Sequence, residues 1–117
     1  MSNWLHAVYD RADALDAEGY ARFFEEDGTF TLANNPPMRG RAEIKAGLTE
    51  FFGTISGMRH DFLRTYQIDD TEIMEAAVTY TRKDGTQVTL PGMTVCVRNQ
   101  DQIRESRAYI DIGPLFQ

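Results

Sequence analysis

One histidine of this sequence, His60, is a candidate for proton transfer. Strand alternation places Met58, His60 and Phe62 on one predicted face, which is apolar apart from the imidazole. The ordinary pKa of histidine lies near neutrality, so the ring can take up and return a proton in an acid/base step. The pattern therefore favours His60 as a catalytic or ligand-contacting residue. A core histidine bonded to a backbone carbonyl is the alternative.

A second group of polar side chains lies on the last predicted strand. Alternation puts Arg107, Tyr109 and Asp111 on one face, which is more typical of a polar pocket floor than of a solvated strand. Arg107 would balance the charge of Asp111, while Tyr109 and Tyr80 would donate hydrogen bonds to a developing oxyanion. An exposed outer face with both charges in solvent is the alternative.

The sequence lacks the motifs for metal binding, for phosphate binding and for a nucleophile elbow. The two histidines, His6 and His60, belong to no cluster of His, Cys, Asp or Glu at metal-ligand spacing. The sequence also contains no phosphate-binding glycine loop before a helix and no nucleophile elbow. We therefore expect neither a metal nor a cofactor.

The composition limits the partners and the cellular location. A net charge of −6 argues against nucleic acid and against anionic membrane surfaces. The first residues lack a signal-peptide pattern, and no stretch approaches the roughly 18 apolar residues of a membrane span. The single cysteine, Cys96, excludes an internal disulfide. We expect a cytoplasmic protein with one domain over residues 1–117.

The N-terminal half should supply helices that position these residues. Apolar spacings of three and four predict a first helix that begins after Ser2 or Asn3. A short second helix should end at Asp27-Gly28, and a third should lie near residues 41–52. Between them, residues 29–33 read as a short strand. In the third helix Gly47 indicates close packing against another element.

The C-terminal half reads as four long antiparallel strands, at residues 58–68, 71–82, 87–98 and 103–112. Lys83-Asp84-Gly85 is the strongest hairpin signal, Pro91-Gly92 indicates a bulge or kink, and Gly113-Pro114 ends the last strand.

Helices gathered on one side of a curved antiparallel sheet make an α+β architecture, and a cavity is expected between the layers. We expect its apolar wall to come from Phe24, Phe30, Ile44, Leu48, Phe51, Met58, Phe62 and Met93. The outer face of the sheet, with Leu63, Cys96, Ala108 and Ile110, should be apolar enough to form a two-fold dimer.

Several motifs, taken in order, resemble the nuclear transport factor 2-like superfamily and, within it, the SnoaL-like proteins. They are LDAEGYARFFEEDGTF at 15–30, PPMRGRAEI at 36–44, GMRHDF at 57–62, VTYTRKDG at 78–85 and RAYIDIGPLF at 107–116. Together they span nearly the whole chain. The resemblance implies a cone-shaped α+β barrel with three N-terminal helices, an apolar pocket and, commonly, a dimer through the outer face of the sheet.

The superfamily includes polyketide cyclases, steroid isomerases, dehydratases, dehydrochlorinases, epoxide hydrolases and binding modules without chemistry, so fold alone does not settle function. Its dehydratases and dehydrochlorinases carry a His–Asp dyad, which the resemblance maps onto His60 and Asp16. Asp13 is the second candidate partner, and a helix cap is the alternative role for Asp16. A tyrosine that precedes the aspartate in the dehydratases is Leu15 here. The late-strand carboxylate of the cyclases and epoxide hydrolases maps onto Asp111.

These observations predict a cofactor-independent acid/base enzyme, an isomerase, cyclase or dehydratase, for a small and largely apolar or amphipathic substrate. The alternative is a non-catalytic dimeric binding module with the same pocket. The expected catalytic residues are His60, Asp16 and Asp111. The expected substrate contacts come from Arg107, Tyr109, Tyr80, Tyr20, Phe24, Phe30, Met38, Phe51, Met58 and Met93.

Overall fold

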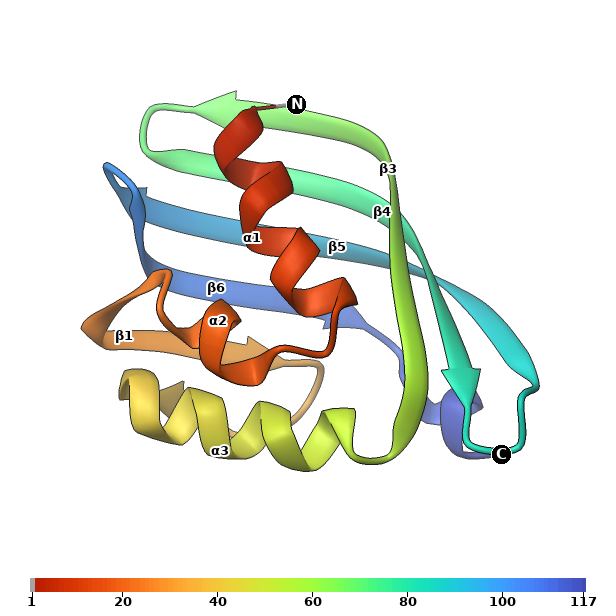
Figure 1. Ribbon diagram of the computed structural model, residues 1–117. Coiled ribbons are helices and arrows are strands. Elements are labelled where there is room, and N and C mark those ends of the chain that lie inside the picture. Colours follow the sequence, from red (N-terminus) through yellow and green to blue (C-terminus); the bar gives the residue numbers. More distant parts are fainter. Residues whose placement is uncertain (1) are drawn as a thin grey trace.

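The computed structural model describes residues 2–117, in which three helices cover one face of a curved sheet (Figure 1). The helices are α1 (Asn3–Asp13), α2 (Ala17–Ala21) and α3 (Gly40–Phe52). The strands are β1 (Phe24–Leu32), β2 (Met38–Arg39), β3 (Ile55–Ile68), β4 (Thr71–Arg82), β5 (Gln87–Asn99) and β6 (Gln102–Ile110), and a 3-10 helix, η1 (Gly113–Phe116), follows. The predicted α+β architecture is confirmed. Within the described residues no helix is both long and apolar enough to cross a membrane.

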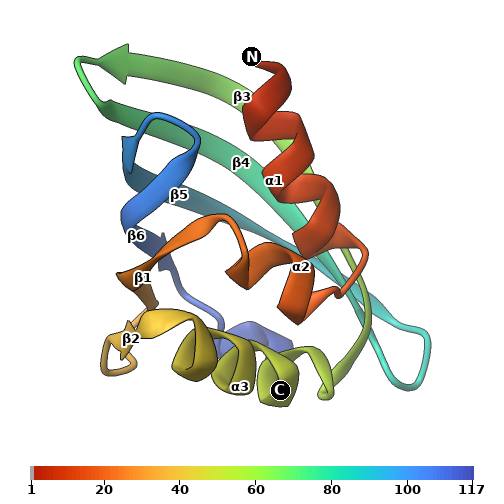
Figure 2. The ribbon, with the colours of Figure 1, turned by 60° about the vertical axis from the view of Figure 1, so that its left-hand side comes forward.

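The six strands form one sheet in the order β2-β1-β6-β5-β4-β3. All neighbouring pairs are antiparallel except β1 and β6, which run parallel. The sheet bends around the helices but keeps two free edges, β2 and β3, so it is an open cone rather than a closed barrel (Figure 2). Helix α1 crosses the concave face, and α3 lies near β1 (Figure 1).

The helices follow the predicted stripe of apolar residues, with one difference in length. The Ser2 hydroxyl caps α1 by accepting a hydrogen bond from the Leu5 amide at 3.1 Å. The second helix is shorter than predicted, because Phe24 already belongs to β1. Asp27-Gly28 therefore lies inside that strand, where the pairing with β6 shifts register between Phe24 and Thr29. Strand pairing with the C-terminal part of the chain overrides the local stop signal here.

The long strands and their turns agree with the sequence, apart from the position of the bulges. Gly85 has the expected positive φ of 89° in the β4–β5 turn. The pairing of β4 with β5 runs without a register shift through Pro91-Gly92, so the predicted bulge is absent. A shift occurs instead in β3, between Phe62 and Arg64. Pro91 is tolerated because it lies just beyond Gly92, the last β5 residue that pairs with β6.

The core lies between the helices and the concave face of the sheet, and it contains residues that were expected outside. Cys96 is only 2% exposed, and Ala108 and Ile110 pack against the buried clusters. Of the four residues predicted for an apolar outer face, Leu63 alone is exposed. The close approach predicted from Gly47 is confirmed, because a Cβ there would collide with the Met38 sulfur.

Candidate functional site

A cavity of about 60 Å³ lies between the helices and the concave face of the sheet. Its wall confirms most of the predicted apolar set: Phe30, Leu48, Phe51, Met58 and Phe62. Met93 borders the cavity, but its side chain is 39% exposed. Phe24 and Ile44, also predicted there, do not line the cavity; both are fully buried in the surrounding core. The predicted cavity therefore exists, and its wall is mainly aromatic and aliphatic.

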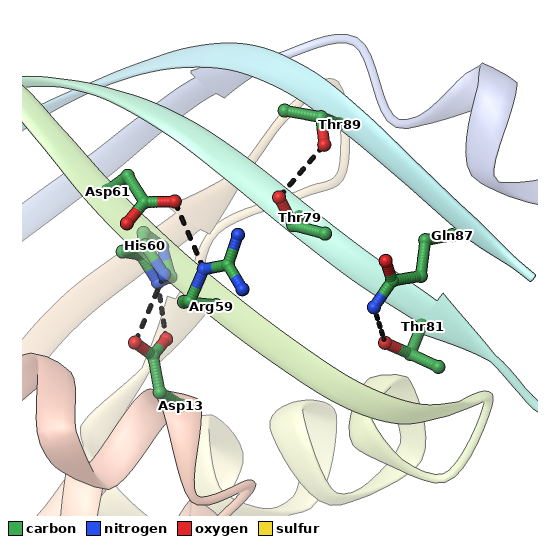
Figure 3. A network of polar contacts seen from close by, with 8 residues as sticks. All are labelled: Asp13, Arg59, His60, Asp61, Thr79, Thr81, Gln87 and Thr89. Atoms are coloured by element: carbon green, nitrogen blue, oxygen red, sulfur yellow. Dashed lines mark hydrogen bonds and ion pairs between the residues drawn. The ribbon is translucent and has the colours of Figure 1, made fainter. Parts of the chain in front are cut away.

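His60 reaches this cavity from β3, as predicted, and its partner is Asp13 at the end of α1. The distance between His60 Nδ1 and Asp13 Oδ1 is 2.6 Å. The other carboxylate oxygen of Asp13 accepts the His60 backbone N–H at 3.0 Å. Figure 3 shows both contacts. One carboxylate thus holds the main chain and the ring of the same residue.

This arrangement determines what the imidazole can do. When the Asp13 carboxylate accepts the Nδ1 hydrogen, Nε2 keeps its lone pair and is the ring nitrogen left for a ligand. The side chains of His60 and Asp13 are 15% and 28% exposed, so the pair is shielded but reachable from solvent. Tyr9 lies against the ring with a centroid distance of 4.8 Å and restricts its orientation. The pair has the geometry of an oriented general base.

Asp16, the first-choice partner from the sequence, does not contact His60. Its Oδ1 accepts the Gly19 backbone N–H at 2.9 Å and caps α2, and its Oδ2 lies 3.4 Å from Arg11. Leu15 has a positive φ of 56° and turns the chain between α1 and α2. Asp16 follows this turn and caps the next helix. A signal for Asp13 existed in its spacing of four from Tyr9, which puts both residues on one helix face.

Two members of the polar constellation predicted on the last strand, Arg107 and Asp111, do not line the cavity. Arg107 is hydrogen-bonded to the Tyr109 hydroxyl at 3.1 Å and forms an ion pair with Glu105. Asp111 is exposed and accepts the Gly113 backbone N–H at 2.9 Å. The other face of β6, with Ala108 and Ile110, lines the cavity instead. Alternation correctly grouped these residues, but the group predicted to face the cavity was the wrong one.

The remaining predicted contacts divide between the cavity and the core. Tyr20 and Tyr80 line the cavity, whereas Met38 packs against α3 and the core. Tyr109 also lines it, but its side chain is 56% exposed. Burial raises the pKa of Tyr80 to about 12, with a smaller contribution from the charge of Asp13. Tyr80 is therefore protonated at neutral pH and can donate a hydrogen bond.

Tyr9 is the cavity residue that the sequence analysis missed. It is 8% exposed and lines the cavity beside His60. Burial raises its pKa well above the ordinary value of tyrosine. Within residues 2–117, no group of three or more His, Cys, Asp or Glu side chains is placed to hold a metal ion.

Comparisons with known proteins agree with this architecture. A model of the SnoaL-like domain family matches residues 5–106. A hypothetical protein with a ketosteroid isomerase-like protein fold from Catenulispora acidiphila DSM 44928, in complex with trimethylamine, superposes with a TM-score of 0.85 at 19% identity, over 93% of this chain and 85% of that one. No curated protein is significantly similar to this chain in sequence.

Two further solved structures share the fold. An NTF2-like protein of unknown function from Burkholderia pseudomallei K96243 has a TM-score of 0.85 at 16% identity, over 99% of this chain and 96% of that one. A putative polyketide cyclase from Xanthomonas campestris pv. campestris has a TM-score of 0.84 at 18% identity, over 96% of this chain and 90% of that one. At these identities the likeness concerns the fold alone.

Proposed function

This chain belongs to the family of SnoaL-like domains, and we propose that it is a cofactor-independent acid/base enzyme acting on a small, largely apolar substrate. The reaction would be an isomerisation, a cyclisation or a dehydration, each of which needs a proton to be removed and returned. The fold supports this class because relatives that share it include a putative polyketide cyclase. The assignment itself depends on the site.

The observation that carries the proposal is the contact between Asp13 and His60 at the wall of an apolar cavity. A carboxylate that holds Nδ1 directs Nε2 to a ligand and stabilises the imidazolium that forms when a proton is taken up. A histidine buried only for packing would not need one carboxylate to hold both its ring and its backbone N–H. The side chain of Asp13, still 28% exposed, also leaves a route by which protons exchange with solvent.

A non-catalytic binding module is the second candidate, and one observation favours it. Neither Asp16 nor Asp111 lines the cavity, so within residues 2–117 no second carboxylate lies beside His60 there. Reactions that use separate acid and base groups would have to return the proton through His60 itself or through a tyrosine hydroxyl. A binder needs only the apolar space.

Ligand capture followed by turnover separates the two candidates. The protein is purified from its own host, the bound molecule is identified by native mass spectrometry, and the molecule is then incubated with fresh protein in D₂O. An enzyme is expected to change its mass by loss of water or to introduce deuterium, and His60→Gln should abolish either change. A ligand that returns unchanged and unlabelled from wild-type protein would support the binding module.

We also propose a two-fold dimer through the outer face of the sheet. The residues that support this dimer are not the predicted ones. Tyr109 on β6 and Met93 on β5 are directly paired neighbours, and their side chains are 56% and 39% exposed. Arg107 and Glu105 flank them with opposite charges, which suits a self-complementary contact. Light scattering should give twice the chain mass at micromolar concentration, and Tyr109→Glu should lower it. A wild-type monomer would contradict the dimer.

A further inference from the structure

The floor of the cavity is made of short side chains on the concave face of the sheet. Ala76 of β4 pairs directly with Gly92 of β5, and Thr94 of β5 pairs directly with Ala108 of β6. All four residues line the cavity. Directly paired residues on neighbouring strands lie side by side on one face, so these four form a continuous patch of floor. The hollow exists because this patch lacks large side chains.

The open floor is short in the direction of the strands. On β5, Cys96 is the next residue on this face beyond Thr94, and it is buried in the core without lining the cavity. In the other direction Leu90 is the next residue beyond Gly92, and it too is buried outside the cavity wall. Side chains on one face of a strand repeat roughly every 6.6 Å. The open floor on β5 is therefore only two residues long.

A leucine from the C-terminal end of the chain closes the space beyond the Leu90 side of the floor. Leu115 of η1 is buried in one cluster with three residues of the cavity wall, Ala76, Val78 and Tyr80. The Arg82 guanidinium fixes its position, because it donates hydrogen bonds to the Leu115 carbonyl at 3.0 Å and to the carbonyl of the preceding residue at 2.9 Å. The Leu115 side chain therefore forms an end wall of the cavity.

The volume of the cavity agrees with this short floor. It measures about 60 Å³, whereas an apolar cavity of about 150 Å³ holds benzene. A single ring therefore already requires a neighbouring side chain to move, and two fused rings exceed the space. Met58 lines the cavity, and its unbranched side chain adapts more easily than the aromatic and branched residues around it.

We propose that Leu115 limits the ligand of this cavity to a single ring, which lies on the floor formed by Ala76, Gly92 and Ala108. The ligand class is a compact, largely apolar molecule with one five- or six-membered ring, and fused-ring molecules are excluded. The inference rests on the proposed function only in taking this cavity as the ligand site. It adds an upper limit on ligand size and names the residue that sets this limit.

Two flat probes that differ by one ring test the limit. The dissociation constants of benzene and naphthalene are measured by ligand-observed NMR for wild type, Leu115→Ala and Phe116→Ala. Wild type should bind benzene more tightly than naphthalene, although naphthalene is the more hydrophobic molecule. Leu115→Ala removes the end wall and should shift the ratio of the two constants toward naphthalene by roughly tenfold or more. Phe116→Ala, at an exposed neighbouring position, should leave the ratio unchanged.

Three results would overturn the proposal. Binding of naphthalene to wild type as tightly as benzene would overturn the single-ring limit. Failure of benzene to bind wild type would overturn the ligand class. An unchanged ratio in folded Leu115→Ala would overturn the role of Leu115.

A measurement on the wild type covers the case in which Leu115→Ala fails to fold. Bound benzene should show intermolecular nuclear Overhauser effects to the methyl groups of Ala76, Ala108 and Leu115. Effects to the two alanines without any to Leu115 would overturn the end wall, and effects to none of the three would overturn the floor.

The size limit and catalysis can fail separately. The probes report binding alone, so a host ligand that returns unchanged from wild-type protein would refute the enzyme and leave the size limit standing. Conversely, turnover of a host ligand with two fused rings would overturn the size limit and retain the enzyme.

Discussion

Two side-chain pairs, each containing one carboxylate, lie on the concave side of the sheet beneath α1, one near each end of that helix. At its C-terminal end Asp13 contacts His60. At its N-terminal end Glu72 of β4 pairs with Arg98 of β5 at 3.2 Å, and the Arg98 guanidinium lies 4.2 Å from the centre of the Trp4 ring. The first pair opens into the cavity. The second is covered, since the Glu72 side chain is 8% exposed.

The difference in their hydrogen bonds separates a site for chemistry from a structural contact. Both oxygens of Asp13 are occupied, which leaves the His60 Nε2 atom as the unused group of the pair. Glu72 Oε1 meets Arg98, whereas Glu72 Oε2 has no partner. In the Asp13–His60 pair both carboxylate oxygens are therefore bonded, and His60 Nε2 is free for a ligand. The Glu72 pair anchors the first turn of α1 through Trp4.

The largest expected effect concerns turnover. Asp13→Asn should lower the rate of conversion of the host ligand by roughly 10²- to 10⁴-fold, because an amide can hold the imidazole in the wrong tautomer and does not stabilise the imidazolium. Glu72→Gln is the matched carboxylate-to-amide change and should stay near the wild-type rate. Equal losses in the two variants would remove the distinction between the pairs.

For stability, unlike turnover, the larger effect should come from the Glu72–Arg98 pair. Arg98→Met leaves the Glu72 carboxylate buried without a partner and should cost about 3–5 kcal/mol of unfolding free energy, measured by urea denaturation. The double variant Glu72→Met with Arg98→Met should recover most of that loss, because no unpaired charge remains. A loss in Arg98→Met of well under 1 kcal/mol would show that the covered pair is not buried in solution.

Raising the pH should destabilise the fold through two buried groups, Cys96 near Glu72 and Tyr80 near Asp13. Burial raises the pKa of the Cys96 thiol from 9.0 to about 12, and the charge of Glu72 raises it further. Burial and the charge of Asp13 likewise raise the pKa of the Tyr80 hydroxyl from 10.0 to about 12. The fold favours the neutral form of both groups. Their stabilisation is therefore complete below pH 9 and is lost progressively as pH rises toward about 12, by at most about 1.4 kcal/mol per group and pH unit.

Urea denaturation at about pH 8 and about pH 10.5 measures this loss. Cys96→Ala and Tyr80→Phe should each make the decline shallower. Glu72→Gln should lower the pKa of the Cys96 thiol, followed by thiolate absorbance, and Asp13→Asn should leave that pKa unchanged. A stability that is equal at the two pH values would contradict the burial of these groups.

The smallest effect separates Asp13 from Asp16. Asp16→Ala removes the cap of α2 and should cost about 1 kcal/mol, whereas Asp16→Asn should cost only a few tenths, because asparagine also caps well. Neither change should reduce turnover. A strong loss of activity in Asp16→Asn, with a normal unfolding midpoint, would show that Asp16 takes part in the reaction.

Much of the architecture could be predicted because its causes are local. The apolar spacing in α1, the Ser2 cap and the Gly85 turn each depend on residues within a few positions. His60 was also recognisable, since it interrupts an apolar strand face. The shorter α2 and the long β1 could not be predicted, because β1 forms by pairing in parallel with β6, about eighty residues later in the chain.

The sequence by itself determined which side chains share a face, and the tertiary structure decided which face turns inward. Alternation groups Arg107 with Tyr109 and Ala108 with Ile110, but a period of two is symmetric between the two sides of a strand. The register of β6 against β5 and β1 then placed Ala108 and Ile110 at the cavity. In the same way, the packing of α1 across β3 chose Asp13 for His60, because only a long-range contact brings those backbones together.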